Sequence, residues 1–352
     1  MIKIFTDQTY LIHKNKGNFF PLFDKMVFDL NSQLYGYFNF TDNIKECNVL
    51  ILPLSIDFFL ENKGKKIVDY FKQLSKKHQK PLWVFSSGDV GLTILDPFIF
   101  VFRVADFESK KRKNSIIMPA FIEDPITNYE NSVLKFLNKT EKPTIGYVGH
   151  AKGGLKKYVK LYLIYLKYNT EVFFKKIHSD YFQLYSSSHV RLKYLKILQK
   201  SSFIQTNFIC RDQYRAGVKN NQDREKTTVA FFENIKNSHY TFCMRGGGNF
   251  SVRLFETLAM GRIPLQINTD CTLPLQDFLD WNSHCVIVDE KDINVADIKI
   301  LEFQAHYSDY EFIELQKRNR IFWQENLTRD KYFSIIHDLF LLKKLGSINS
   351  VD

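Results

Sequence analysis

The sequence predicts an α/β protein in which two parallel sheets occupy separate domains. Short apolar runs rich in Val, Ile, Phe and Tyr alternate with amphipathic segments along the chain, which is typical of parallel sheets. The length of 352 residues suggests two domains at about 150 residues each. A weakly periodic stretch around 121–143, with Pro125 and Pro143, precedes a second α/β run and predicts the domain boundary.

Each expected element follows from a local pattern. The strands are short runs of β-branched and aromatic residues: Ile2–Thr6, Val49–Pro53, Leu82–Ser86, Ile99–Arg103, Thr144–Val148, Phe203–Ile209, Tyr240–Met244, Ile263–Ile267 and Cys285–Val288. The helices are longer amphipathic segments: Gly64–Lys77, Leu155–Lys167, Arg224–Ile235, Ser251–Met260, Asp309–Glu325 and Asp330–Lys344. We expect domains over 1–140 and 141–328, a C-terminal helix over 329–345, and a frayed tail from Gly346.

Composition narrows the class of protein. Hydrophobic residues make up 45% and charged residues 25%, which is ordinary for a globular protein and excludes a disordered, collagenous or disulfide-scaffold chain. The five cysteines contain no C-x-x-C pair, so a zinc ribbon is not expected and a reducing compartment is favoured.

The net charge and the apolar runs indicate where in the cell the protein is expected. The start MIKIFTDQTY reads as a strand rather than a signal peptide, and the apolar run Val49–Leu60 is too short to span a bilayer. We therefore expect a cytoplasmic protein. The net charge of +11 favours anionic partners, so a peripheral contact with the anionic inner face of a membrane stays open.

The most informative segment is 238–290, which reads as a strand, a glycine-rich turn, a helix and a second strand. Gly246, Gly247 and the following glycine let the backbone bend sharply and approach a ligand. The helix is expected to start near Asn249 or Ser251, both of which are good caps. The free N–H groups of its first turn suit a phosphate.

Charged residues flank this turn. Arg245 ends the strand, and Arg253 and Glu256 lie on one face of the helix because they are three residues apart. An Arg and a Glu presented together can bind the phosphate and the ribose of one nucleotide. The alternative is a surface ion pair beside a plain turn, because the segment matches neither the P-loop nor G-x-G-x-x-G.

Several motifs of this segment occur together in a known family. They are F-C-x-R-G at Phe242–Gly246, R-L-F-E at Arg253–Glu256, G-x-I-P at Gly261–Pro264, Leu273-Pro274, Asp280-Trp281 and V-x-V-x-E at Val286–Glu290. In order and spacing the segment resembles the C-terminal part of the exostosin-like glycosyltransferases. Weaker similarities are Glu46–Val49 with Pro53, and Gly88–Gly91, which is similar to the family's H-D-x-G turn. Departures are Met244 in place of a Pro and Gly88 in place of the His.

The resemblance implies a fold, an activity and a donor site. The fold is of the GT-B type, with two Rossmann-like domains facing a cleft and a C-terminal helix that crosses back to the first domain. The activity is inverting transfer from a nucleotide sugar, with UDP favoured, to a glycan or lipid-linked saccharide. The expected donor site comprises Arg245, Gly246, Gly247, Asn249, Ser251, Arg253 and Glu256.

The general base is expected in the N-terminal domain or at the domain junction. Asp89 is the first candidate because it lies in a glycine turn after a strand, and Asp7, at the end of the first strand, is the second. His150 is a third candidate. Beside it, Gly149 and Lys152 belong to a second glycine-rich turn that would touch the diphosphate or the acceptor, unless it is a simple connection.

Other features are given ordinary interpretations. The basic run 110–113 is expected to be a solvated loop, with contact to an anionic lipid or polymer as the alternative. Leu155–Tyr168 is expected to be an ordinary amphipathic helix rather than a membrane anchor. There is no D-x-D triplet, so no metal and no cofactor are expected, and the nucleotide sugar is a substrate.

Two other functions are considered. One is a fucosyltransferase-like enzyme that uses a GDP-sugar. The other is a non-catalytic protein that binds polyanions or nucleic acid, which the net charge allows. It is disfavoured, and no nucleic-acid partner is expected, because the sequence shows no basic stripe with interleaved stacking aromatics.

Overall fold

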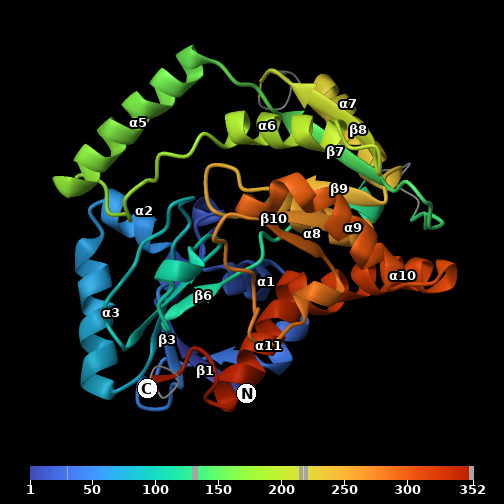
Figure 1. Cartoon of the computed structure of the whole chain (residues 1–352). Coiled ribbons are helices and arrows are strands. Elements are labelled where there is room, and N and C mark those ends of the chain that lie inside the picture. The colour runs from blue at the N-terminus through green and yellow to red at the C-terminus, as the bar shows by residue number, and fades with distance from the viewer. Residues whose placement is uncertain (30, 129–133, 214–216, 218–220, 349–352) are drawn as a thin grey trace.

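The computed structural model describes residues 1–29, 31–128, 134–213, 217 and 221–348, and it contains two parallel sheets (Figure 1). We call the part of the chain with the first sheet the N-terminal unit and the part with the second sheet the C-terminal unit. The two sheets confirm the predicted fold class. The boundary expected near residue 140 falls between the last strand of the first sheet and the first strand of the second.

The first sheet has six strands in the order β2-β1-β3-β4-β5-β6, and all pairs are parallel. Its strands are β1 (Ile2–Phe5), β2 (Phe38–Phe40), β3 (Val49–Ile51), β4 (Leu82–Phe85), β5 (Ile99–Arg103) and β6 (Ser115–Ile117). The helices of this unit are α1 (Pro21–Phe28), α2 (Ile56–Glu61) and α3 (Lys65–His78), and α4 (Pro125–Asn128) follows the sheet. Sequence analysis missed β2 (FNF) and β6 (SII), because each is only three residues long and one of the three is polar, whereas the equally short β3 (VLI) is entirely apolar.

The second sheet has five parallel strands in the order β11-β10-β9-β7-β8. They are β7 (Thr144–His150), β8 (Gln205–Arg211), β9 (Tyr240–Cys243), β10 (Ile263–Asn268) and β11 (Val286–Asp289). The helices of this unit are α5 (Leu155–Phe173), α6 (Ser187–Gln199), α7 (Asn221–Lys236), α8 (Val252–Ala259), α9 (Ala296–Ala305) and α10 (Asp309–Phe322). Most of them lie close to the sheet, whereas α5 extends away from it as an arm (Figure 1).

The last helix, α11 (Arg329–Leu341), crosses back to the N-terminal unit, as predicted. Arg329 forms an ion pair of 2.7 Å with Asp24 on α1, and the hydroxyl of Tyr332 donates to the carbonyl of Ile117 at 3.0 Å. The indole of Trp83 donates to the carbonyl of Gly346 at 2.8 Å. The expectation of a tail that frays from Gly346 is therefore wrong at its start, and its last residues, 349–352, lie outside the described residues.

The two units also meet where strands of both sheets end. The segment after β5 forms an antiparallel bridge from Phe107 to Cys271, which follows β10. The side-chain amide of Asn249 donates to the carbonyl of Asp106 at 3.0 Å. Carboxyl ends of both sheets thus face one junction, which is where α/β proteins bind ligands.

Candidate functional site

The glycine-rich loop joins β9 to α8 at the junction of the two units. Ser251 is the N-cap of α8, as expected, but its side chain makes no capping hydrogen bond. Asn249 lies in the loop and is fully buried. Its amide donates to the carbonyls of Asp106 and Asp270, and its side-chain oxygen accepts from Thr269 at 2.7 Å. Asn249 therefore holds the loop in place through hydrogen bonds within the protein. The side chain of Ser251 does not cap the first turn of α8.

Arg245 leaves the end of β9 and is buried between two aromatic rings. Its guanidinium carbon lies 4.5 Å from the ring centre of Tyr185 and 5.2 Å from that of Phe107. Within the described part of the chain it forms no salt bridge, and its Nε is buried without an acceptor. Burial lowers the pKa of this guanidinium, whereas Tyr185 and Glu290 oppose that change. A buried cation without an acceptor is costly, so the position suits an anionic ligand.

A second arginine near Arg245 was not found by sequence analysis. Arg191, on α6, is buried and donates to the carbonyl of His150 at 2.8 Å and to that of Arg245 at 2.7 Å. It thereby ties together the two loops that follow β7 and β9. Burial lowers the pKa of Arg191, and the nearby charge of Arg253 adds to this effect. No motif marks this residue in the sequence, because its partners are backbone atoms of distant loops.

Arg253 reaches from α8 to the end of β7. Its guanidinium donates to the carbonyl of Val148 at 2.7 Å and lies 4.5 Å from the ring centre of Tyr147. A Cβ at Gly149 would lie 3.0 Å from its Nη2, so the second glycine turn passes directly beside this cation. The structure thus brings Arg253 and Gly149, two separately predicted residues, into one place.

Two glutamates of the expected motifs have different surroundings. Glu256 lies on α8 one turn after Arg253 and is half-buried. Glu290 accepts hydrogen bonds of 2.7 Å from the hydroxyls of both Tyr185 and Tyr194. Burial and Glu290 together raise the pKa of Tyr185, which keeps its hydroxyl protonated. Glu290 therefore fixes the position of the Tyr185 ring, on which the guanidinium of Arg245 lies. Neither tyrosine was identified from the sequence.

The lesser candidates have local partners. The Nε2 of His150 lies 2.6 Å from the ammonium group of Lys157, and burial together with that charge lowers the pKa of the imidazole. Lys152 forms an ion pair of 2.8 Å with Asp212. In the N-terminal unit, Asp7 caps a short 3₁₀ turn by accepting from the amide and hydroxyl of Thr9, at 3.1 and 2.6 Å. The Asp7 carboxylate is therefore occupied by its own turn.

Asp89 lies opposite the glycine run. A Cβ at Gly247 would come 2.8 Å from the Oδ2 of Asp89, and a Cβ at Gly248 would come 2.5 Å from its backbone carbonyl oxygen. The turn that follows β4 thus packs directly on the loop that follows β9. The structure places the first candidate base at the junction, facing the loop of the expected donor site.

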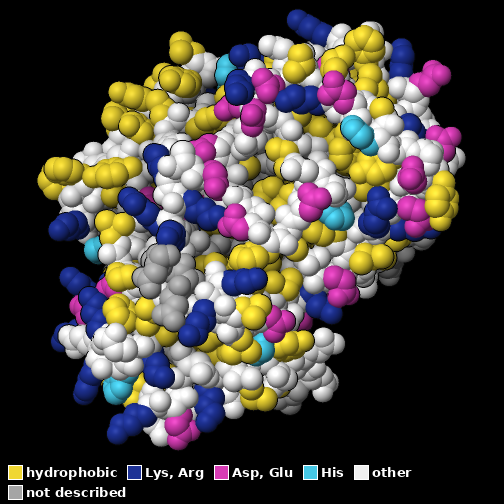
Figure 2. Space-filling view, turned by 60° about the horizontal axis from the view of Figure 1, so that its bottom comes forward, with side chains coloured by type: hydrophobic (Ala, Val, Ile, Leu, Met, Phe, Trp, Pro, Cys, Tyr) yellow, Lys and Arg dark blue, Asp and Glu magenta, His cyan; other side chains and the backbone are white. Residues whose placement is uncertain are grey.

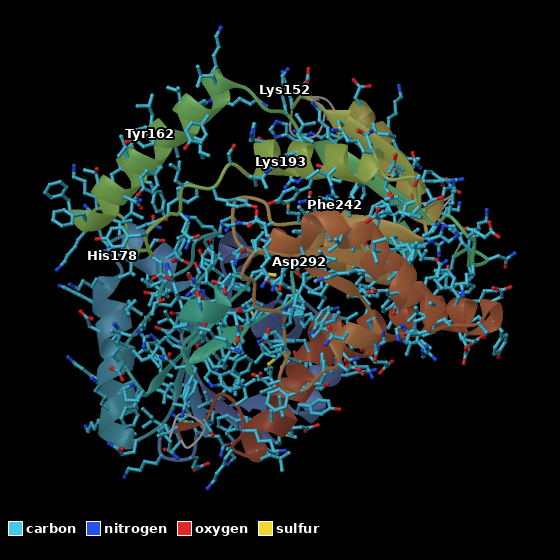
Figure 3. All side chains as sticks on the ribbon, in the orientation of Figure 1. Lys152, Tyr162, His178, Lys193, Phe242 and Asp292 are labelled. Carbon is cyan, nitrogen blue, oxygen red and sulfur yellow. The ribbon has the colours of Figure 1, made fainter. Side chains whose placement is uncertain are left out.

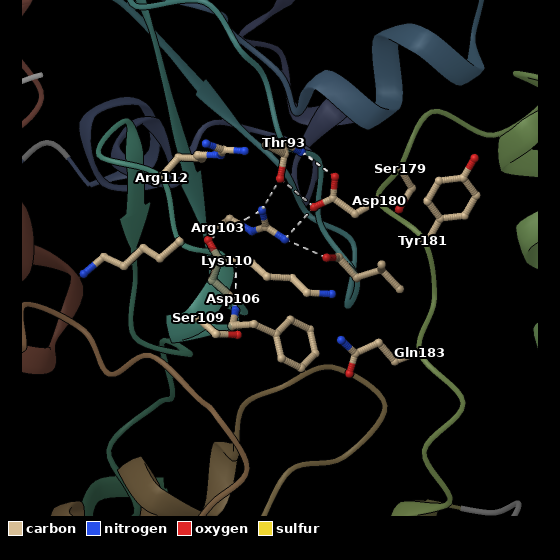
Figure 4. A pocket seen from close by; sticks show the side chains of 13 residues that line it. Thr93, Arg103, Asp106, Ser109, Lys110, Arg112, Ser179, Asp180, Tyr181 and Gln183 are labelled. Atoms are coloured by element: carbon tan, nitrogen blue, oxygen red, sulfur yellow. Dashed lines mark hydrogen bonds and ion pairs between the residues drawn. The ribbon is translucent and has the colours of Figure 1, made fainter.

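A cavity of about 570 Å³ opens beside this junction and is lined by both units (Figure 4). Its walls include Val90, Phe107, Asp180 and Gln183, and Arg103 is held in its floor by ion pairs with Asp180 (3.1 Å) and Asp106 (3.7 Å). The volume lies in the range that small-molecule sites occupy. Phe107 lines this cavity and also packs on Arg245, so the two sites are neighbours that share this ring.

The basic run 110–113 is largely exposed, as expected of a solvated loop, but it also has a position that was not expected. Lys110, Lys111 and Arg112 line the cavity rather than forming only a solvated loop. The loop is held in place because Ser109 and Glu108 bind the segment after β10, at Asp270 and Gln276. Sequence analysis did not predict that this loop is anchored, because its partners lie more than 160 positions away in the chain. Across the described ranges, no three His, Cys, Asp or Glu side chains are grouped to hold a metal ion.

Two comparisons with known proteins concern the sequence of this chain. Residues 174–302 match the exostosin GT47 domain, and this range includes Arg191, Arg245, Glu256 and Glu290. Over 73 residues the chain is 35% identical to a probable glucuronosyltransferase 47 A of Physcomitrium patens, a stretch that covers 21% of this chain and 16% of that protein.

Two solved structures align with most of the chain at low identity and with TM-scores below 0.5. A glycosyltransferase from Rickettsia africae is 10% identical with a TM-score of 0.38, covering 97% of this chain and 98% of its own. A lipopolysaccharide outer core galactosyltransferase, WaaB, is 13% identical with a TM-score of 0.39, covering 87% of this chain and 84% of its own. Residues 174–302, fewer than half of the chain, match the exostosin GT47 domain, and the glycine-rich loop and the motifs of the candidate site lie within this range.

Proposed function

We propose that the protein is an inverting glycosyltransferase that moves a sugar from a UDP-sugar to a saccharide acceptor, either a glycan or a lipid-linked saccharide. The observation that carries this proposal is the environment of Arg245. Its guanidinium is buried between Phe107 and Tyr185 without a carboxylate partner, at the start of the glycine run. A diphosphate at this point would supply the missing negative charge.

The C-terminal unit would bind the donor. Arg245, Arg253 and the first turn of α8 would hold the diphosphate, and Glu256 would accept hydrogen bonds from the ribose hydroxyls. Negative charge grows on the diphosphate as its bond to the sugar breaks. Cations that are already held by aromatic rings and carbonyls stabilise that charge without reorganising.

Asp89 would act as the general base. It accepts the proton of the acceptor hydroxyl while that oxygen attacks the anomeric carbon, and the nucleoside diphosphate leaves from the opposite face. This single displacement inverts the anomeric centre. The carboxylate faces the glycine run from the other unit, which is the arrangement that the displacement requires. His150, with its lowered pKa, and Asp7 are the alternatives, and Asp7 is weaker because its own turn already binds it.

The cavity beside Phe107 would take the acceptor. Its lining of aromatic, amide and cationic side chains offers both a flat apolar face and hydrogen-bond donors, and Lys110 extends into it (Figure 4). For location we propose the cytoplasm, because the five cysteines are free thiols, as expected in a reducing compartment.

A thermal-shift panel of nucleoside diphosphates tests the donor class, because a ligand that binds only the native state stabilises it by about 2.7 kcal/mol at one hundred times its Kd. UDP should raise the melting temperature most, and Arg245→Ala should remove the shift. A larger effect of GDP would instead support the fucosyltransferase-like alternative. If no nucleoside diphosphate stabilises the protein while DNA does, the polyanion-binding alternative is correct.

A further inference from the structure

Helix α5 presents an unusual surface, because none of its residues is buried. We expected an ordinary amphipathic helix rather than a membrane anchor, and such a helix usually buries its apolar face in the core, which α5 does not. Leu155 is 78% exposed and Phe173 is 68% exposed. The helix forms an arm that stands away from the second sheet, with Tyr162 near its middle (Figures 1 and 3).

Five of the exposed apolar side chains form a stripe along one side of the helix, with Tyr158 and Leu163 beside it, whereas Ile164, also exposed, lies on the other side. Their spacing of four, three, four and seven residues places them on one face. We call this set the α5 stripe: Leu155, Val159, Tyr162, Leu166 and Phe173. Apolar side chains project at this edge of the molecule (Figure 2).

Two residues near the C-terminal end of α5, Tyr168 and Asn169, hold the helix to the segment that follows it. The hydroxyl of Tyr168 donates to Ser179 at 2.8 Å, and the side chain of Asn169 binds both backbone groups of Phe182, at 2.8 and 3.0 Å. The segment 177–185 thus lies against the inner face of the helix. Tyr168 lies away from the stripe, whereas Asn169 lies at its edge, three residues after Leu166, and the stripe residues themselves stay exposed.

Lysines flank the stripe. Residues 152–176 contain seven lysines and one glutamate. Lys156, Lys160 and Lys167 share one face by their spacing, next to the stripe, and all three are exposed. An apolar stripe bordered by lysines is typical of a helix that lies in the interface of an anionic bilayer, because the long side chains reach the headgroups while the apolar ones enter the acyl boundary.

We propose that α5 docks the protein on an anionic membrane surface, with the α5 stripe below the headgroups and the flanking lysines at lipid phosphates. The excess of lysines favours a lipid surface over a neutral protein partner. No helix of the described ranges is long and apolar enough to cross a membrane. The segment after α5 lines the interdomain cavity at Asp180 and Gln183, so docking would hold that cavity near the bilayer.

Vesicle flotation with the full chain tests this proposal without any activity. The protein should float with phosphatidylcholine vesicles that contain phosphatidylglycerol and remain behind with phosphatidylcholine alone. Val159→Ser/Tyr162→Ser/Leu166→Ser, which removes the middle of the stripe, and Lys156→Glu/Lys160→Glu should each reduce binding by on the order of tenfold or more. The matched controls are Tyr310→Ser/Ile321→Ser on α10 and Lys343→Glu/Lys344→Glu after α11, all exposed and away from α5, and they should bind like the wild type.

Three results would overturn the proposal. They are no binding to anionic vesicles, equal binding to both kinds of vesicle, and binding by both α5 variants at the wild-type level. Light scattering could give a fourth contradicting result. If the wild type self-associates and the stripe variant does not, the surface binds a second copy of the chain instead of a membrane. The lysine variant removes no apolar contact, so it keeps the test decisive if the stripe variant misfolds. Stabilisation by UDP is measured separately, so failure here does not affect the proposed transferase function.

Discussion

The carboxylate of Asp89 occupies the space that a side chain at Gly247 would need, across the two units: a Cβ at Gly247 would lie 2.8 Å from the Oδ2 of Asp89. The candidate base is therefore positioned by a loop of the other unit, not by its own turn alone. Any side chain at this glycine must push the carboxylate away. The neighbouring Gly248 meets the backbone of the same turn, at 2.5 Å from the Asp89 carbonyl oxygen.

The two glycines should therefore respond differently to alanine. In Gly247→Ala the clash is with the end of a mobile side chain, so we expect a large loss of turnover with little change in melting temperature. In Gly248→Ala the clash is with backbone, so we expect a loss of about 1–3 kcal/mol in the free energy of unfolding. Thermal unfolding measures the stability of each variant, and turnover at saturating donor measures its activity. Equal turnover in Gly247→Ala and the wild type would contradict the role of this contact.

Asp89→Asn should abolish transfer and leave donor binding unchanged. The amide has nearly the same size as the carboxylate but cannot accept the proton of the acceptor hydroxyl. Single-turnover kinetics and UDP binding separate the two effects. Asp7→Asn, on the turn after β1, is the matched control and should retain activity. If Asp89→Asn turns over like the wild type, the base is Asp7, His150 or another group.

Arg245→Ala should lower turnover on the order of 10²-fold while the KM for the acceptor changes little. The guanidinium faces charge that develops only as the sugar leaves, so its removal raises the barrier more than it weakens acceptor binding. Arg245→Lys should recover part of the rate, because it keeps the charge and loses the planar contact with Phe107 and Tyr185. Near-normal turnover of the alanine variant at saturating donor would exclude this role.

Glu256→Ala should weaken nucleotide binding by about 1–3 kcal/mol, the cost of lost hydrogen bonds to two ribose hydroxyls. Isothermal titration with UDP measures this change. Glu302→Ala, an exposed glutamate on α9, is the control and should bind as the wild type does. A large drop in melting temperature without a change in affinity would show that Glu256 acts only in the packing of α8.

Transfer should continue in the presence of EDTA. The sequence has no D-x-D triplet, and three arginines with a helix N-terminus stand where the diphosphate would lie. Activity assays with EDTA, with and without added manganese, test this expectation. Loss of transfer on chelation and its recovery with manganese would contradict the metal-free mechanism and direct attention to Asp289–Asp292, the acidic stretch that begins at the end of β11.

The sequence by itself determined the two parallel sheets and the position of the glycine-rich loop. Both are local: a buried strand needs a run of β-branched or aromatic residues, and a sharp turn before a helix needs glycines and a cap. Strand β5 and the start of α8 could be located in this way. The short strands β2 and β6 could not, because each has three residues of which one is polar, which leaves no apolar run to recognise.

Only the tertiary structure decided the surroundings of the candidate site. Phe107 and Tyr185 come from different units and enclose Arg245, and Arg191 joins two loops through their carbonyls. The same is true of α5, whose periodic pattern predicted a helix but not that the apolar face points away from the core. The physical reason is that periodicity records which residues share a face, whereas what that face meets depends on contacts between segments far apart in the chain.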